Sequence, residues 1–210
     1  MKKTIIFDMD GLLIDSEQAT FKIYQQFLLK YNINYTKEDY IQLLGKTQSF
    51  AKSLFNKEYG PAFNFDLFWN ETHELLDKTL IQEPILKPGC IELLSYLKQK
   101  QYHIVLATSS YSNRAQAILK GQGIYSYFDD FVFGNEVEKG KPNPEIFIKA
   151  ARHYALSDCL ILEDSEAGIE AGFRANIDVI CIPDMKYPSK EFQTKCNMIL
   201  SNLSDVLSIL

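Results

Sequence analysis

The sequence predicts an α/β fold in which a parallel sheet carries a small inserted all-helical domain. Two observations predict it. Short apolar runs alternate with segments of helical periodicity along most of the chain, and this alternation is typical of a parallel sheet covered by helices on both faces. Between residues 17 and 83 the alternation stops, and only helical patterns occur. A helical block inserted into a parallel-sheet protein is best interpreted as a cap.

The predicted strands are short apolar runs rich in β-branched residues. The first, Thr4–Phe7, stops at Asp8 and predicts a buried strand with carboxylates at its end. The same pattern recurs at 103–107, 160–162 and 179–182, and runs at 131–133 and 198–200 are candidates for edge strands. Ligands of such sheets bind outside the carboxyl ends of the strands. Asp8, Thr108 and Asp164 would all lie there.

The helices predicted around the sheet span residues 89–98, 113–120, 144–154 and 166–175. The inserted block contains four more helical stretches. Apolar residues at helical spacing mark the first, Thr36 and Asp39 resemble a capping box before a second that runs to Gly45, and Gly60 closes the third. The spaced apolar residues of this block, which we expect to be core, are Ala19, Ile23, Phe27, Tyr31, Phe50, Leu54, Phe68, Leu75 and Leu76. We therefore expect a Rossmann-like catalytic core of residues 1–15 and 86–210 and a cap of residues 16–85.

Composition limits the classes of partner. The net charge of −5 offers no basic face for nucleic acid. The first apolar run is too short for a signal peptide or a membrane span, so a cytoplasmic protein with free thiols and no membrane partner is expected. The three histidines have no partner at ligand spacing and are expected to lie outside the chemistry. The sequence does not specify the oligomeric state, and a monomer is compatible with it.

Two pairs of acidic residues follow predicted strands. Asp8 and Asp10 lie two residues apart and would face one cavity if strand geometry persists, with Gly11 allowing a sharp turn. The alternative is a pair of acidic turn residues. Glu163 and Asp164 end another strand, where they could cap the next helix or complete the oxygen ligands of a Mg²⁺ ion.

Two further motifs suit a phosphate group. Thr108 and Ser109 lie between a strand and a helix, where hydroxyl and backbone N–H groups could bind phosphate or simply cap the helix. Lys141 lies in the segment GKPNP, which would offer a fixed positive charge to an anionic site, although most lysines are solvated.

All four motifs occur in one order: FDMDGLLIDSE, LATSS, GKPNPEIF and ILEDSEAGIEAG. With them the chain resembles the haloacid dehalogenase (HAD) superfamily of aspartyl-phosphate phosphotransferases. The helical insertion after the first motif is similar to the cap of the β-phosphoglucomutase-like branch. The shorter matches FDMDGLL, LGK, ATSS and IPD resemble its pseudouridine-5′-phosphatase-like members.

This resemblance implies a HAD-type phosphoric monoester hydrolase that requires Mg²⁺. Asp8 would be the nucleophile and Asp10 the general acid–base, with Lys141 bridging Asp8 and the phosphate. Thr108 and the Ser109 amide would bind phosphate oxygens. The metal would be held by Asp8, the carbonyl of Asp10 and Asp164, with Glu163 nearby or direct. Gly45 and Lys46 fall in the cap loop that faces substrate, where Lys46 could contact a polar or anionic leaving group or lie in solvent.

Three functions compete. The favoured one is a phosphatase of a small phosphorylated metabolite, such as a sugar phosphate or nucleoside monophosphate. A phosphomutase is the first alternative, but the β-phosphoglucomutases resembled here carry an arginine where this chain has Gln48, and a histidine where it has Thr20. A non-catalytic protein that binds a phosphometabolite is the second alternative, which the complete set of motif residues argues against.

Overall fold

The computed structural model describes residues 2–83 and 85–210 and contains one parallel sheet of six strands. Residues 1 and 84, which the predicted core and cap segments include, lie outside the described residues. The strand order is β3-β2-β1-β4-β5-β6. The bounds are β1 Thr4–Phe7, β2 His103–Thr108, β3 Asp130–Phe133, β4 Cys159–Glu163, β5 Asp178–Cys181 and β6 Met198–Ile199. Every predicted strand is confirmed, and the two short runs form the sheet edges.

The first strand lies in the middle of the sheet. Phe7 pairs in register with Leu106 of β2 and with Leu162 of β4. All four residues of β1 are buried because helices cover both faces, and such strands are nearly continuous apolar runs; Thr4 is the one polar residue of β1. As a result Asp8, Thr108 and Asp164 end adjacent strands at the same edge of the sheet.

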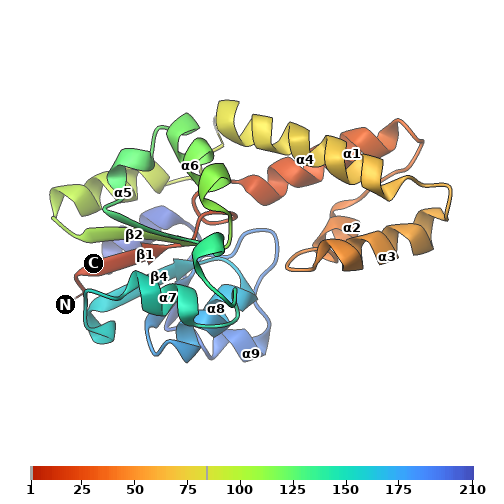
Figure 1. The fold of residues 1–210 in the computed structure, drawn as a ribbon. Coiled ribbons are helices and arrows are strands. Elements are labelled where there is room, and N and C mark those ends of the chain that lie inside the picture. The colour runs from red at the N-terminus through yellow and green to blue at the C-terminus, as the bar shows by residue number, and fades with distance from the viewer. Residues whose placement is uncertain (1, 84) are drawn as a thin grey trace.

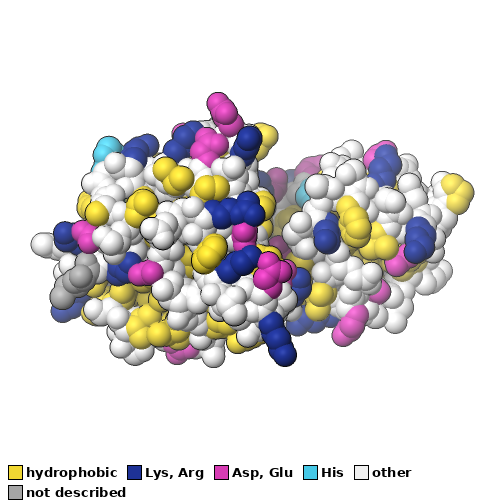
Figure 2. Space-filling view, turned by 90° about the horizontal axis from the view of Figure 1, so that it is seen from below, with side chains coloured by type: hydrophobic (Ala, Val, Ile, Leu, Met, Phe, Trp, Pro, Cys, Tyr) yellow, Lys and Arg dark blue, Asp and Glu magenta, His cyan; other side chains and the backbone are white. Residues whose placement is uncertain are grey.

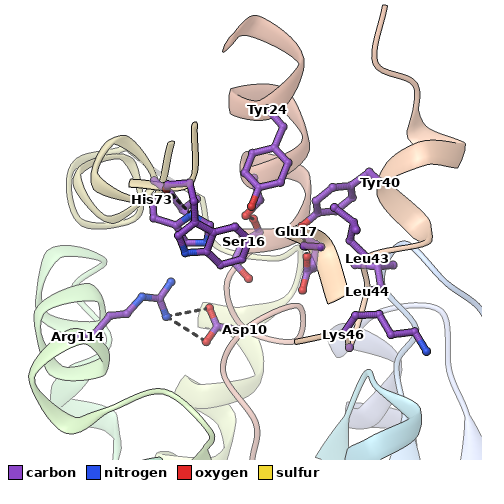
Figure 3. Close-up of a pocket in the computed structure, with 15 residues that line it drawn as sticks. Asp10, Ser16, Glu17, Tyr24, Tyr40, Leu43, Leu44, Lys46, His73 and Arg114 are labelled. Atoms are coloured by element: carbon purple, nitrogen blue, oxygen red, sulfur yellow. Dashed lines mark hydrogen bonds and ion pairs between the residues drawn. The ribbon is translucent and has the colours of Figure 1, made fainter. Parts of the chain in front are cut away.

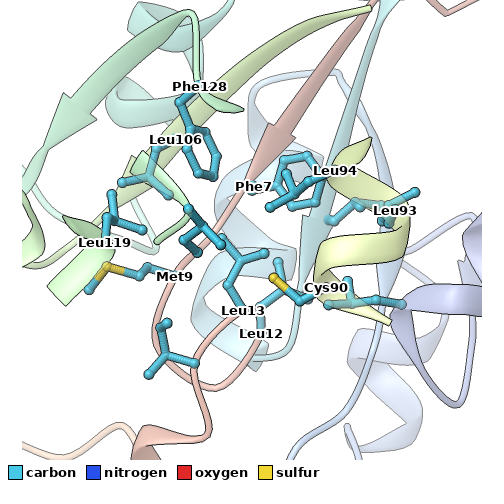
Figure 4. Close-up of a cluster of buried hydrophobic side chains, with 14 of the residues drawn as sticks. Phe7, Met9, Leu12, Leu13, Cys90, Leu93, Leu94, Leu106, Leu119 and Phe128 are labelled. Atoms are coloured by element: carbon cyan, nitrogen blue, oxygen red, sulfur yellow. The ribbon is translucent and has the colours of Figure 1, made fainter. Parts of the chain in front are cut away.

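Helices cover the two faces (Figure 1), and alternate strand residues face opposite layers. Ile5, Phe7 and Leu106 belong to the core under α5 (Cys90–Gln99) and α6 (Ser112–Gly121). Figure 4 shows this layer around Phe7, Leu94 and Phe128. On the other face α7 (Glu145–Ala150) and α8 (Glu166–Arg174) cover Ile6 and its neighbours, and α9 (Lys190–Gln193) packs beside α8.

The cap consists of α1 (Ser16–Leu29), α2 (Lys37–Ile41), α3 (Gln48–Tyr59) and α4 (Phe65–Gln82). It lies beyond the carboxyl edge of the sheet and has its own aromatic core (Figure 1). Phe55 stacks on Phe68 with ring centroids 4.8 Å apart, a geometry that contributes about 0.5–1.5 kcal/mol beyond burial. The predicted capping box of α2 is present, with Asp39 N–H donating to Thr36 Oγ1 over 3.2 Å.

Several element bounds and faces differ from the predictions. The helix expected to reach Gly45 ends at Ile41, and the helix expected over 144–154 ends at Ala150; turns follow both. In α3 the buried side chains are Ala51 and Phe55, whereas Phe50 is 43% exposed. Tyr31 and Leu75 are also exposed, because the packed stripe of a short helix covers only part of an apolar face.

The cysteines match the expectation, since all four are free thiols and Cys159 and Cys181 are buried. Across residues 2–83 and 85–210, the helices are too short or too polar to span a bilayer. On the face shown in Figure 2, basic and acidic side chains are interspersed over core and cap.

Candidate active site

An ion cluster lies at the carboxyl edge of the sheet, between the ends of β1 and β4. Lys141 Nζ donates to Asp8 Oδ1 over 2.5 Å and to Glu163 Oε1 over 2.7 Å. The lysine comes from the loop before α7, so residues far apart in sequence meet here. Its side chain is only 6% exposed and that of Glu163 1%. The structure thus brings together three of the predicted site residues.

At Asp8 and Lys141, burial and the neighbouring opposite charges shift the pKa in opposite directions. Burial raises the pKa of Asp8 to about 7, although Lys141 lowers it. Burial also raises the pKa of Asp164 well above its ordinary value, and Glu163 and Asp8 add to that shift. Burial alone would lower the pKa of Lys141, but the charges of Asp8 and Glu163 raise it. The cluster therefore holds more negative charge than its lysine offsets.

Asp8, Glu163 and Asp164 offer carboxylate oxygens within 4.8 Å of one another, a spacing that fits a metal ion. The oxygens of Glu163 are occupied: Oε1 accepts from Lys141, and Oε2 accepts from the backbone N–H groups of Asp164 and Ser165. Asp164 differs, because its buried Oδ1 has no hydrogen-bond partner among the described residues. A buried, unpartnered carboxylate oxygen beside two further carboxylates suits a hard divalent cation such as Mg²⁺.

Two glycines leave space for these carboxylates. Gly11 has φ +83°, and a Cβ there would lie 2.3 Å from Asp164 Oδ2. Its predicted turn is present, and it also permits the close approach of Asp164. At Gly168 in α8, a Cβ would lie 1.8 Å from Glu163 Oε1.

Asp10 lies in a different set of contacts from Asp8. Its Oδ2 accepts from Ser110 Oγ over 2.8 Å and from Arg114 Nη1 over 3.4 Å. The Nε of Arg114 also donates to Asp77 Oδ1 over 2.8 Å. Because Arg114 lies on core helix α6 and Asp77 on cap helix α4, one guanidinium joins the cap to the carboxylate of Asp10.

The predicted phosphate-binding residues lie at the end of β2. Thr108 is buried, and its Oγ1 accepts from the N–H of Ser110 over 3.1 Å. Ser109 is exposed. The hydroxyl of Thr108 thus organises the turn that also presents Ser110 to Asp10.

A cavity of about 240 Å³ lies between Asp10 and the cap (Figure 3). Its lining includes the predicted cap residues Gly45 and Lys46, and Lys46 is exposed. From the core come Asp10 and Arg114, and from the cap Ser16, Glu17, Thr20, Tyr24, Tyr40, Leu43, Leu44, Gly45, Lys46, Ala51, Trp69, His73 and Leu76.

A second cavity, of about 450 Å³, lies beside Asp164 of the carboxylate cluster. Asp164 and Ser165 line it from the core, and Glu17, Gly45 and Lys46 line both cavities. The cap loop therefore faces both the carboxylate cluster and the space over Asp10.

Sequence reasoning missed several residues of the site. His73 lines the first cavity. Glu17 is the last residue of the first motif, and Arg114 lies one helical turn after Ser110, so both positions carried a signal. The sequence carried no signal for the cavity residues on α4, because their position depends on how the cap packs onto the core.

The chain was compared with known families and proteins. The family model for haloacid dehalogenase-like hydrolases matches residues 5–182. A phosphorylated carbohydrates phosphatase of Thermotoga maritima is 30% identical over 85% of this chain and 83% of its own length. A probable pseudouridine-5′-phosphatase of Drosophila melanogaster is 31% identical, covering 95% and 89%. A glycerol-3-phosphatase of Arabidopsis thaliana is 29% identical, covering 96% and 70%.

Solved structures share the fold. A crystal structure from Thermotoga maritima described as a "putative beta-phosphoglucomutase" superposes with a TM-score of 0.84 at 26% identity, covering 100% of this chain and 98% of the other.

Proposed function

The chain belongs to the haloacid dehalogenase-like hydrolase family, and on that premise we propose that it is a Mg²⁺-dependent phosphatase that works through a phosphorylated Asp8. The substrate we propose is a small phosphorylated metabolite, a sugar phosphate or a nucleoside monophosphate. Relatives named as phosphatases of carbohydrates, of pseudouridine 5′-phosphate and of glycerol 3-phosphate support this class. We also propose that residues 1–15 and 86–210 are the catalytic core and residues 16–85 the cap.

The observation that carries the proposal is the buried contact of Asp8 with Lys141 beside the unpartnered oxygen of Asp164. A carboxylate held by a buried lysine at the end of a central strand is positioned to attack phosphorus. The same lysine offsets the charge of an incoming phosphate, since phosphoryl transfer is mostly positioning and charge neutralisation. Thr108 and the Ser109 amide would hold phosphate oxygens at the adjacent strand end.

The reaction proceeds in two transfers. A carboxylate oxygen of Asp8 attacks phosphorus, the bond to the leaving alcohol breaks, and Asp10 gives that alcohol a proton. Water then attacks the phosphorus of the aspartyl phosphate and Asp10 takes a proton of the water. The bond between phosphorus and the Asp8 oxygen breaks, so inorganic phosphate leaves and the Asp8 carboxylate is regenerated. Ser110 and Arg114 orient the carboxylate of Asp10 for both transfers.

The metal ligands we propose are Asp8, Asp164 and the backbone carbonyl of Asp10. When bound, Mg²⁺ would lower the repulsion between the anionic nucleophile and the anionic phosphate. Both carboxylate oxygens of Glu163 already accept hydrogen bonds, one from Lys141 and one from the backbone at the start of the next helix. Glu163 therefore offers no free oxygen to the metal. Its role in the proposal is to hold Lys141 beside Asp8.

The cap supplies the other wall of the site. Gly45 and Lys46 line both cavities, and Lys46 is exposed at their mouth. We place Lys46 where it can meet a polar leaving group. A cap closed over the core excludes water until the phosphate is bound.

A phosphomutase is the second candidate, and Arg114 in the cavity over Asp10 is the observation that favours it. A mutase needs a cation for the phosphate that is not transferring. Arg114 already contacts Asp10 and Asp77, and Gln48 cannot replace an arginine fork. Incubation with β-glucose 1-phosphate and catalytic glucose 1,6-bisphosphate separates the two: we expect free phosphate, whereas rapid glucose 6-phosphate formation would establish the mutase.

The proposal is tested with the Asp8→Asn variant and p-nitrophenyl phosphate. We expect the wild type to release p-nitrophenol with Mg²⁺ and to stop in EDTA, and Asp8→Asn to be inactive while its circular dichroism spectrum is unchanged. An inactive wild type would favour the non-catalytic binding protein. Ordinary turnover by folded Asp8→Asn would exclude Asp8 as nucleophile.

A further inference from the structure

We propose that the cavity over Asp10 selects an uncharged, hydroxyl-rich leaving group of monosaccharide size, and that Glu17 makes this selection. This inference rests on the proposed phosphatase function and deepens it. It concerns the part of the substrate that leaves, which the carboxylate cluster does not contact.

The position of the leaving group follows from Asp10. The proton donor must lie within hydrogen-bond reach of the leaving oxygen, and Asp10 lines the cavity of about 240 Å³ but not the larger one. That volume is below the roughly 300–1,000 Å³ of pockets that hold drug-sized ligands. A monosaccharide or a shorter polyol therefore suits it better than a nucleoside.

The polar groups of the cavity match hydroxyls. The hydroxyl of Tyr40 donates to Glu17 Oε2, which fixes the carboxylate at the cavity wall opposite Asp10 (Figure 3). An ionised carboxylate accepts several hydrogen bonds and donates none, so its remaining lone pairs suit hydroxyl donors. Ser16 is 4% exposed, lines the same cavity, and its Oγ has no partner among residues 2–83 and 85–210. A buried hydroxyl without a hydrogen-bond partner is expected to bond to a ligand group or to a water.

An aromatic wall completes the cavity. Trp69 and His73 stack with ring centroids 3.9 Å apart, and both line it. Aromatic rings supply a flat apolar surface with a polar edge, which suits the mixed C–H and hydroxyl surface of a sugar. Tyr24 extends this wall from α1.

The charge balance disfavours a second anionic group. Glu17 and Asp10 are carboxylates facing the cavity. Of its two permanent cations, Arg114 is already paired with Asp10 and Asp77, and Lys46 is exposed to solvent, which screens its charge. Burial lowers the pKa of His73, so this ring adds no positive charge near neutral pH. Burial raises the pKa of Glu17 to about 7 even against the Tyr40 hydrogen bond, and the charges of Asp10 and Asp184 add to that shift. A leaving group with its own phosphate or carboxylate would add further negative charge.

The test is steady-state phosphate release from three classes of monoester. Glycerol 3-phosphate, ribose 5-phosphate and glucose 6-phosphate represent uncharged polyols; phosphoglycolate and glucose 1,6-bisphosphate represent charged leaving groups; uridine 5′-monophosphate represents a larger one. We expect the best polyol to exceed the other two classes in kcat/KM by about tenfold or more, a difference that one hydrogen bond to a charged group can supply. A charged or nucleoside ester as the best substrate would overturn the inference.

The variant Glu17→Gln gives a signature that a structural defect would not. We expect kcat/KM to fall about tenfold for the best polyol and to rise for glucose 1,6-bisphosphate, because an ionisable acceptor has been removed from the cavity wall. Glu71→Gln removes the same charge from an exposed position of α4, and we expect it to change neither value. An equal fall for both substrates in Glu17→Gln would overturn the role of Glu17.

Tyr40→Phe keeps the inference testable if Glu17→Gln does not fold. It retains the ring and removes the hydroxyl that holds the Glu17 carboxylate. We expect kcat/KM to fall for the best polyol and to rise for glucose 1,6-bisphosphate, by less than in Glu17→Gln. Unchanged kcat/KM values for both substrates would count against selection by Glu17. Hydrolysis of p-nitrophenyl phosphate distinguishes failure of the phosphatase function from failure of the leaving-group selection. If the wild type does not hydrolyse it, the proposed function fails; if it does and the substrate order is reversed, only the inference on the leaving group fails.

Discussion

Replacing Lys141 by methionine should destabilise the metal-free protein because two buried carboxylates, Asp8 and Glu163, then lack their cation. The lysine side chain is 6% exposed and contacts Asp8 and Glu163 directly. Removing one partner of a buried ion pair costs about 3–5 kcal/mol. We expect the lower end, about 3 kcal/mol, because Asp8 can take up a proton in response. For a chain of 210 residues, this corresponds to a fall in Tm of roughly 6–12 °C.

The loss of stability in Lys141→Met should be larger at higher pH. Burial raises the pKa of Asp8 to about 7 in the native state, against about 3.9 when unfolded. The native state therefore binds the proton more tightly, and its stability falls as pH rises from about 4 to about 7. Without Lys141, which lowers the pKa of Asp8, the pH range over which stability falls extends to higher pH. The difference in Tm between variant and wild type should thus be larger at about pH 8 than at about pH 5.5.

Calorimetry or circular dichroism melts in EDTA measure these differences. Lys139→Met is the matched control, because it removes the same charge from an exposed position two residues away in the same loop. We expect it to change Tm by less than about 2 °C, since exposed charges contribute about 0–1 kcal/mol. If Lys141→Met melts with the control at both pH values, the buried ion cluster does not hold as described.

Three further outcomes are expected. Asp164→Asn should raise the Mg²⁺ concentration for half-maximal phosphatase activity by about 10–100-fold, and an unchanged metal titration would remove Asp164 from the site. Gly168→Ala should lower both activity and Tm, because its Cβ would lie 1.8 Å from Oε1 of Glu163, the atom that contacts Lys141; Gly140→Ala, with open space around it, is the control and should match the wild type. Asp77→Asn should lower kcat a few-fold through loss of the anchor of Arg114, while Tm changes little because Asp77 is 49% exposed; unchanged kcat would show that the link between cap and core plays no part in turnover.

The sequence by itself determined the elements and the edge of the sheet at which the site lies. A central strand buried on both faces is a nearly continuous apolar run, so Thr4–Phe7 and its counterparts were readable as strands. In a parallel sheet their carboxyl ends share one edge, which placed Asp8, Thr108 and Asp164 near one another before any coordinates. The resemblance of the GKPNP motif implied that Lys141 lies beside Asp8, and the structure contains this contact.

Only the tertiary structure decided what lies across the site from these residues. Helical periodicity gives a face to each cap helix but not the angle at which it meets the core, so the choice of Ala51 over Phe50 as a buried residue was not readable. The same holds for the pairing of Arg114 with Asp77, because long polar side chains at partly exposed positions have many possible partners and tertiary packing selects among them. The cavity over Asp10 is therefore a product of cap packing. The carboxylate cluster, by contrast, follows from the ends of the strands.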